Sequence, residues 1–498
     1  MKERLMVGRL RHFIENDDEF HVALLAGLRR TGKTTILKQI QSYYPDSVYI
    51  DLSKSGDGYL EIQERFLEQP TSLLLLDEIT YIDHYEWITQ SLYDESGGTP
   101  KFKMVITGSS PAHIAKLAYT KLGGGRSKLF RLPLLTFIEY LYFVGKIDSY
   151  DVYDAVVNSD FSDYLQLKGL ESSDSSNLLW TLNNEYFQSI YLENTVSNSN
   201  TYLTASKTRL KPGDLESLAD LIAYKLSHFC GYLNMIDPKV GRKEQLNLSR
   251  VGVNLKLNKI DLSEAFVTVS SEMVKTIPAD VKGRILYYLL ESGLAYIGYA
   301  DEKKDDPLME DVDISFVLDV LKNCTKHSEL ISLFERVTIS IISPLFYTRL
   351  GFDILDRAGI SRDQLCTDML LGLMLEMYLC GAVCSWSNDL ILVSRKLNYP
   401  GVGEVDIFDA KYRLLCESTI SDKKSKNIHV SKYYKLLYLI RICSSKTKDM
   451  FNGDYYQIPY AKLCCMMDTG DIFSLEKTII DNRDSDRDTI QFNDINST

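Results

Sequence analysis

The sequence lacks any apolar run long enough to cross a membrane and any pattern typical of a secretory signal. No stretch reaches the roughly 18 apolar residues of a membrane span, and the first residues are basic, with Lys2, Arg4 and Arg9. The 9 cysteines are scattered from Cys230 to Cys465, without the paired spacing of a zinc site or the density of a disulfide scaffold. We therefore expect a cytoplasmic protein with reduced thiols and no membrane partner.

The sequence also lacks a surplus of positive charge and any internal repeat. A formal net charge of -12 disfavours nucleic-acid binding over the whole surface, although a local basic patch stays compatible with it. What the chain does have is length and apolar content, because 498 residues with 45% hydrophobic side chains exceed one compact core. We expect three domains.

Residues 1–145 have the pattern of one α/β domain. Short apolar runs at 22–26, 47–52, 73–76 and 104–107 are separated by helix-like stretches. Continuous apolar strands that alternate with helices predict a parallel sheet covered on both faces.

A phosphate-binding loop follows the first of these strands. Residues 27–34 read GLRRTGKT, which fits the required spacing at every fixed position and lies between a strand and a helix. Glycines let backbone N–H groups and the helix N-terminus face a phosphate, the lysine reaches the β- and γ-oxygens, and the last threonine offers a hydroxyl to Mg²⁺. The predicted ATP-binding residues are Gly27, Arg30, Thr31, Gly32, Lys33, Thr34 and Thr35.

Two carboxylates, Asp77 and Glu78, end the third predicted strand. Ligands bind at the carboxyl ends of the strands in open α/β sheets. We expect Asp77, with Thr34, to hold Mg²⁺, and Glu78 to orient and deprotonate the attacking water. A helix-capping role for the pair is the alternative.

Small polar residues and an arginine complete the candidate site. Thr107 and Ser109 follow the fourth strand and either sense the γ-phosphate or cap the next helix. Arg126 follows three glycines, and this exposed position suits an arginine finger that reaches the ATP of a neighbouring subunit. From the residues alone, an ordinary surface arginine is the simpler interpretation.

The rest of the chain is less regular. Residues 146–345 form a mostly helical middle region, in which a helix at 279–291 and a strand at 294–299 suit either a winged-helix element or a helix packed on a strand. Residues 346–480 read as a second α/β domain, with a long helix around 369–383 and strands at 390–393, 404–408 and 413–416. Residues 481–498 read as a polar tail.

The chain resembles the prokaryotic AAA-type ATPases that carry a DUF4143-type C-terminal domain. The resemblance rests on 27–35, 73–78, 106–110, 125–126 and the LPLLTFIE segment at 132–139, and it resumes at 343–355, 372–376 and 403–406. It implies ATP and Mg²⁺ as cofactors and a homo-oligomer in which Arg126 is the finger. The middle region is longer than this family leads us to expect.

The C-terminal part of that family is similar to PD-(D/E)XK nucleases. Their sites hold Mg²⁺ with a helix carboxylate, an aspartate and a Glu-x-Lys strand. The matching carboxylates here are Glu376, Asp406 and Glu417, whereas Thr419 stands at the lysine position. A nuclease-derived fold that no longer cuts is therefore the alternative. A basic run from Lys423 to Lys435 either follows a phosphate backbone or forms a solvated helix face.

The sequence thus predicts an ATPase that couples its nucleotide state to the winged-helix-like and nuclease-like parts, with DNA or a protein as partner. Two alternatives remain open. One is an ATP-gated, Mg²⁺-dependent DNA nuclease, and the other is a nucleotide-dependent binding scaffold with little catalysis.

Overall fold

The computed structural model describes the N-terminal domain almost completely and parts of the remaining chain. No helix in the described part of the chain is both long and apolar enough to cross a membrane. The described residues are 2–54, 60–62, 64, 72–95, 102–119, 126–133, 135–145, 147–150, 211, 214, 256–257, 260–261, 277–293, 295–299, 314–341, 392–396, 404–409, 414–419, 438–443, 450–452 and 455–459.

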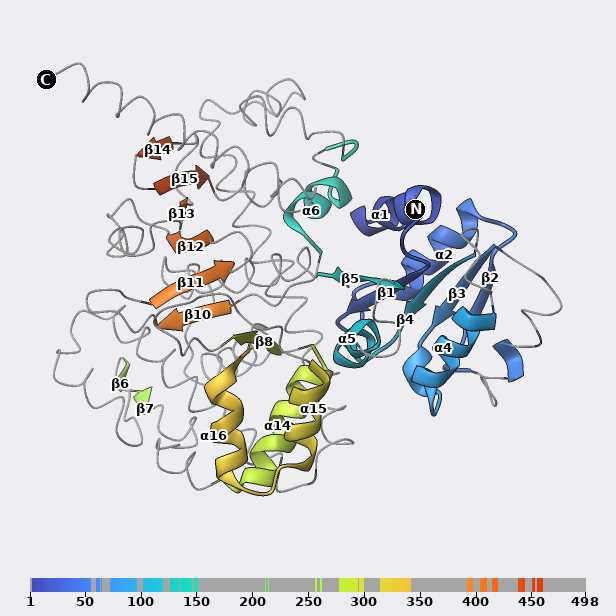
Figure 1. Ribbon diagram of the computed structural model, residues 1–498. Helices are drawn as coiled ribbons and strands as arrows, with labels where there is room; N and C mark the ends of the chain where they lie inside the picture. The colour runs from blue at the N-terminus through green and yellow to red at the C-terminus, as the bar shows by residue number, and fades with distance from the viewer. Residues whose placement is uncertain are drawn as a thin grey trace, which may run out of the picture.

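A five-stranded parallel sheet organises the N-terminal domain (Figure 1). Its order is β2-β3-β4-β1-β5, so β4 lies between β1 and β3. Because all strands run the same way, their carboxyl ends meet at one edge of the sheet. The strands are β1 (Val22–Gly27), β2 (Val48–Asp51), β3 (Leu73–Asp77), β4 (Lys103–Thr107) and β5 (Ser127–Leu132).

Helices cover both faces of this sheet (Figure 1). On one side, α1 buries Met6, Leu10 and Phe13, which recur at helical spacing, against apolar residues of α2 and the strands. On the other side lie α4 and α5. The helical elements are α1 (Leu5–Asn16), α2 (Lys33–Tyr43), η1 (Ile79–Tyr81), α4 (Tyr85–Glu95), α5 (Pro111–Tyr119) and α6 (Phe137–Phe143).

The predicted α/β organisation of the N-terminal region is confirmed. Each predicted strand occurs within one or two residues of its expected ends, and the helix after the phosphate-binding loop begins at Lys33. Every residue of β1 and β3 is buried, which is the physical reason why these strands read as continuous apolar runs.

The middle region contains a helix–strand–helix–helix–strand unit. It comprises α14 (Ala279–Glu291), β8 (Ala295–Tyr299), α15 (Ile314–Asn323), α16 (His327–Arg336) and β9 (Val337–Ile341), and β8 pairs antiparallel with β9. A Cβ on Gly283 would lie 2.4 Å from the Leu321 carbonyl oxygen, so only glycine lets α14 approach α15 this closely. The sequence pattern indicated α14 and β8 but not α15, α16 or β9.

Six short strands in the C-terminal part form a mixed sheet of order β10-β11-β12-β13-β15-β14 (Figure 1). The pairs β10–β11, β11–β12 and β14–β15 are antiparallel, whereas β12–β13 and β13–β15 are parallel. A further antiparallel pair joins β6 to β7. The bounds are β6 (Lys256–Leu257), β7 (Ile260–Asp261), β10 (Leu392–Lys396), β11 (Glu404–Asp409), β12 (Leu414–Thr419), β13 (Tyr438–Cys443), β14 (Met450–Asn452) and β15 (Tyr455–Pro459).

The strand predicted at 390–393 lies two to three residues further along the chain, since β10 spans Leu392–Lys396. The strand predicted at 413–416 extends to Thr419. The predicted helix around 369–383, the basic run at 423–435 and the polar tail lie outside the described residues.

Candidate nucleotide-binding site

The phosphate-binding loop connects β1 to α2 through two residues in the left-handed backbone region, Arg30 at φ 64° and Gly32 at φ 93°. Gly27 ends β1 against β5, where a Cβ would lie 2.9 Å from the Cβ of Leu132. Gly32 precedes α2 and supplies no capping side chain, so the first N–H groups of α2 are left for another acceptor. A loop closed around an uncapped helix N-terminus is suited to bind an anion.

Lys33 is folded back onto this loop. Its ammonium donates to the carbonyl oxygens of Gly27 and Leu28, both at 2.9 Å. The side chain is only 5% exposed, and burial lowers the pKa of Lys33 to about 8, although the carboxylates of Glu78 and Asp77 counteract that effect. A phosphate arriving at the loop would offer this buried cation a stronger acceptor than the two carbonyls.

Asp77 ends β3 as a buried carboxylate, 1% exposed. The Thr107 hydroxyl donates to its Oδ1 at 3.2 Å, and the Tyr49 hydroxyl donates to its Oδ2 at 3.0 Å. Both oxygens are thus held in one orientation, as the second ligand shell of a metal site requires.

Glu78 follows β3 with a left-handed backbone, φ 59°, a conformation that is uncommon for residues other than glycine. Burial and the neighbouring Asp77 raise the pKa of Glu78, while Lys33 and a hydrogen bond from Ser109 oppose this shift. Its Oε2 atom is buried and has no hydrogen-bond partner among the described residues. A buried carboxylate oxygen without a donor calls for a water or a ligand at that point.

Thr107 and Ser109 reach the two carboxylates because β4 is the strand between β1 and β3. Thr107 contacts Asp77 and Ser109 contacts Glu78. Helix α5 begins at Pro111. The carbonyl of Ser110 accepts the hydrogen bond from Ile114 N, so Ser110 holds the N-cap position of this helix. This places Thr107 and Ser109 beside the predicted catalytic groups rather than at the helix cap.

Arg126 lies at the amino ends of the strands, whereas its own phosphate-binding loop lies at their carboxyl ends. Ser127 pairs with Val22 at the amino end of β1, whereas the loop follows the carboxyl end. Five strand residues at ~3.3 Å each separate the two edges by roughly 17 Å. The guanidinium carbon is 5.4 Å from the centre of the Tyr93 ring. Arg126 therefore cannot contact a phosphate on its own loop.

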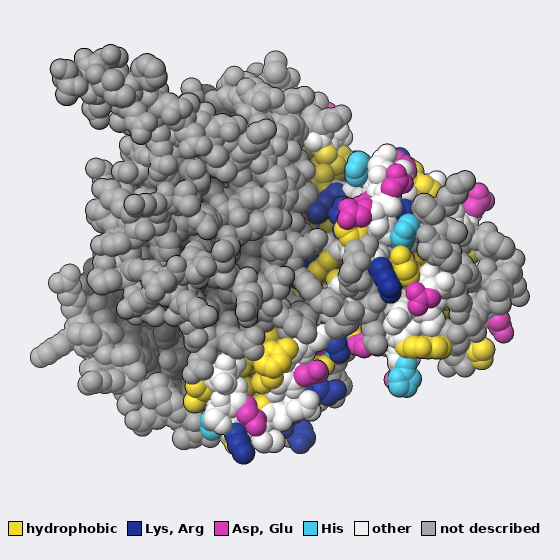
Figure 2. All heavy atoms as spheres, viewed as in Figure 1, with side chains coloured by type: hydrophobic (Ala, Val, Ile, Leu, Met, Phe, Trp, Pro, Cys, Tyr) yellow, Lys and Arg dark blue, Asp and Glu magenta, His cyan; other side chains and the backbone are white. Residues whose placement is uncertain are grey.

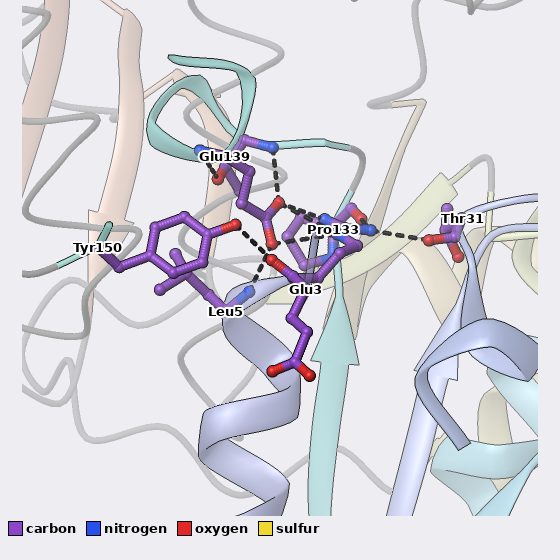
Figure 3. A network of polar contacts seen from close by, with 8 residues as sticks. Glu3, Leu5, Thr31, Pro133, Glu139 and Tyr150 are labelled. Atoms are coloured by element: carbon purple, nitrogen blue, oxygen red, sulfur yellow. Dashed lines mark hydrogen bonds and ion pairs between the residues drawn. The ribbon is translucent and has the colours of Figure 1, made fainter. Parts of the chain in front are cut away.

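The LPLLTFIE segment has a structural role that its sequence did not disclose (Figure 3). Glu139, 2% exposed, accepts three hydrogen bonds from Arg4 and one from the backbone N–H of Leu5. It also closes a capping box with Thr136. Arg4 in turn donates to the Thr31 carbonyl at 2.8 Å and to that of Pro133 at 3.2 Å. The segment thus ties α1 and α6 to the phosphate-binding loop.

The residues fit ATP with Mg²⁺. Within the described residues, no group of three or more His, Cys, Asp or Glu side chains could hold a metal by itself. Mg²⁺ typically binds through one or two carboxylates together with substrate phosphates and water, which Asp77, the Thr34 hydroxyl and a loop-bound nucleotide can provide.

Of the predicted C-terminal carboxylates, Glu376 lies outside the described residues. Ile407 of β11 pairs with Cys416 of β12 in antiparallel register, so continuing the register by one residue sets Asp406 opposite Glu417. Glu417 is in turn level with Arg441 of β13. The basic run proposed beside this set is not among the described residues, and on the face shown in Figure 2 the described surface mixes basic and acidic side chains.

Sequence reasoning missed Tyr49 as a partner of Asp77 and Arg4 as a partner of Glu139. In the sequence, Arg4 stands out only as one of the basic residues near the N-terminus. A signal for Tyr49 did exist, because it lies two residues before the end of a strand that a parallel sheet could set beside β3.

The fold and the site together define a P-loop nucleotide-binding domain. Residues 19–141 match the family model described as an AAA domain, so the N-terminal region contains a domain of the AAA type. The chain is also 32% identical over 161 residues to an uncharacterized protein, MJ1637, of Methanocaldococcus jannaschii. That match covers 29% of this chain and 32% of the length of the relative, about a third of it.

Proposed function

We propose that this protein binds ATP with Mg²⁺ at the phosphate-binding loop and hydrolyses it to ADP and phosphate. The observation that carries the proposal is the buried Glu78 Oε2, which lacks a hydrogen-bond partner in the described part of the chain and belongs to a carboxylate with a raised pKa. A general base needs such a free oxygen and a basicity above that of an exposed glutamate. Phosphate release from ATP by the full chain tests the proposal.

Each group has one task in this scheme. Lys33 leaves the two carbonyls and pairs with the phosphates. Thr34 and Asp77 would hold Mg²⁺, which when bound would supply positive charge against the transferred phosphoryl group. Gly27, Arg30, Thr31, Gly32 and Thr35 surround the phosphates through the loop backbone and the start of α2. Glu78 orients and deprotonates the attacking water, and Ser109 fixes the Glu78 carboxylate.

We further propose that the nucleotide state is transmitted to the middle region through the C-terminal turn of α14. The Ser110 hydroxyl donates to the Glu291 carbonyl at 3.1 Å and lies 2.8 Å from His113 Nδ1. A hydroxyl has one proton, so Nδ1 carries the donor hydrogen and, in a neutral ring, Nε2 accepts from the Tyr287 hydroxyl at 2.9 Å. A hydrogen-bonded chain therefore leads from the end of β4 into α14.

The same turn of α14 touches the phosphate-binding loop. Gly293 has φ +71°, and a Cβ there would lie 2.9 Å from Leu28 Cδ2 and 3.0 Å from Pro111 Cγ. The carbonyl of Leu28 is one of the two that Lys33 occupies. A nucleotide that draws Lys33 away changes the bonding of Leu28, and the close-packed Gly293 turn has no spare room to absorb a shift.

Hydrogen exchange of the full chain, with and without ATP, tests this transmission. We expect ATP to change the exchange of α14 amides in the wild type, and Tyr287→Phe to reduce that change by at least about half without altering ATP affinity. Tyr44→Phe is the matched control, because it removes a tyrosine hydroxyl that is bonded to Glu15 at the C-terminal end of α2, the end away from the loop. If ATP left the exchange of the α14 amides unchanged in the wild type, the contact between α14 and the loop would not transmit the nucleotide state.

For Arg126 we propose the finger role in a homo-oligomer, supported by its distance from its own loop. Arg126→Ala should lower turnover by about 10³-fold or more. Mixing that variant with Lys33→Ala protein should restore part of the activity, because an intact loop then faces an intact finger in some neighbouring pairs. Turnover that is normal in Arg126→Ala, or constant on dilution to a demonstrated monomer, would make Arg126 an ordinary surface cation stacked on Tyr93.

A Mg²⁺-dependent nuclease is the second candidate function, for the C-terminal part of the chain. It is supported by the register that sets Asp406 opposite Glu417. A basic residue, Arg441 of β13, is level with Glu417, whereas the family pattern has its lysine two residues further along β12. DNA cutting in Mg²⁺ or Mn²⁺ that Asp406→Ala abolishes would favour it. Uncut DNA would leave the winged-helix-like and nuclease-like parts to bind a DNA or protein partner without cleavage.

A further inference from the structure

A hydrogen-bond donor to Asp77 lies on the neighbouring strand, β2. In the parallel pairing of β2 with β3, Tyr49 is level with Leu75 and Asp51 with Asp77. Residues two apart on a strand share a face, and register partners share it as well, so Tyr49 and Asp77 lie on the same face of the sheet. The tyrosine ring spans the two-residue offset and brings its hydroxyl to Asp77 Oδ2 at 3.0 Å.

This hydroxyl does more than complete the core. The Tyr49 ring packs partly buried against the cluster formed by α1, α2 and the strands, and a phenylalanine would pack there equally well. The hydroxyl adds a donor to a carboxylate that is 1% exposed and that, within the described part of the chain, has one further side-chain donor, Thr107, on its other oxygen. Without Tyr49, Oδ2 would lose its described donor, and the buried Asp77 carboxylate would no longer be held in one orientation.

We propose that Tyr49 is a positioning residue for Mg²⁺, one that fixes the orientation of the Asp77 carboxylate and thereby sets the Mg²⁺ requirement of nucleotide binding. The proposal rests on the proposed function, because it takes the ligand of the loop to be a Mg²⁺–nucleotide complex. Tyr49 itself does not touch the metal. Loss of such an outer-shell partner typically weakens metal affinity by about 10- to 100-fold.

Binding of a fluorescent ATP analogue to the full chain tests the inference without relying on turnover. We expect Tyr49→Phe to bind the analogue in EDTA as the wild type does, but to need about tenfold more Mg²⁺ for half of the Mg²⁺-dependent gain in affinity. Tyr44→Phe, which removes a surface hydroxyl, should match the wild type in both titrations. Thermal unfolding of each variant reports whether the fold is intact.

A double-mutant cycle supplies the second arm. If Tyr49 acts through Asp77, then Asp77→Asn should show the Mg²⁺ defect, and adding Tyr49→Phe to it should cause no further loss. Mg²⁺ half-saturation unchanged in Tyr49→Phe, equal losses with and without Mg²⁺, or losses that multiply in the double variant would each overturn the inference. Failure of the wild type to bind the analogue would instead contradict the proposed function.

Discussion

Lys33→Ala is expected to abolish ATP binding. Lys33 is 5% exposed, and its ammonium is bonded to carbonyl oxygens of the loop at which the phosphates are proposed to bind. Leaving a buried phosphate charge without its cation costs about 3–5 kcal/mol, which raises the dissociation constant by roughly 100- to 1000-fold or more. Equilibrium titration with a fluorescent ATP analogue measures this change.

The control for Lys33 is on the same helix. Lys38 is exposed on α2, so Lys38→Ala removes the same charge from the same element at a point away from the loop. It should leave the dissociation constant within about a factor of two, because an exposed charge contributes little. Equal affinity of Lys33→Ala and wild type would exclude the loop as the binding site.

Glu78→Gln is expected to keep ATP binding and to stop hydrolysis. The amide has the size of the carboxylate and can keep the contact with Ser109, yet it cannot take a proton from water. Loss of a general base lowers turnover by about 10²- to 10⁴-fold. Affinity measured by titration and phosphate release measured in parallel separate the two effects.

The matched control for this substitution is Glu86→Gln. Glu86 lies on α4 and pairs with Lys116 at 3.1 Å, so its amide variant loses a partly exposed ion pair that is not among the proposed ATP-binding and catalytic groups. Its turnover should equal that of the wild type. Wild-type turnover in Glu78→Gln would place the base on another residue.

The loop and its two carboxylates could be predicted because their signals are local. The fixed residues of the loop are consecutive, and Asp77 and Glu78 directly follow an apolar run whose burial the structure confirms. Parallel strands then bring the two segments together at one edge of the sheet, whatever lies between them. The sequence alone was therefore enough to propose that Lys33 lies near Asp77 and Glu78.

The partners of these groups depend on contacts between distant segments. Arg4 and Glu139 are 135 residues apart, and neither shows in its own neighbourhood that it is buried against the other. Tyr49 reaches Asp77 only through the register of β2 on β3, which a single sequence does not fix. For the same reason, the contact of Gly293 with Leu28 had no local signal, since an isolated glycine after a helix is explained by its C-terminal cap alone.

Steady-state phosphate release by the full wild-type chain, with ATP and Mg²⁺, tests the central claim most directly. We predict ADP and phosphate in equal amounts, at a rate that falls to background in Lys33→Ala and Glu78→Gln protein prepared in the same way. Phosphate release no greater than that of these two variants, at ATP concentrations that saturate binding, would contradict the account.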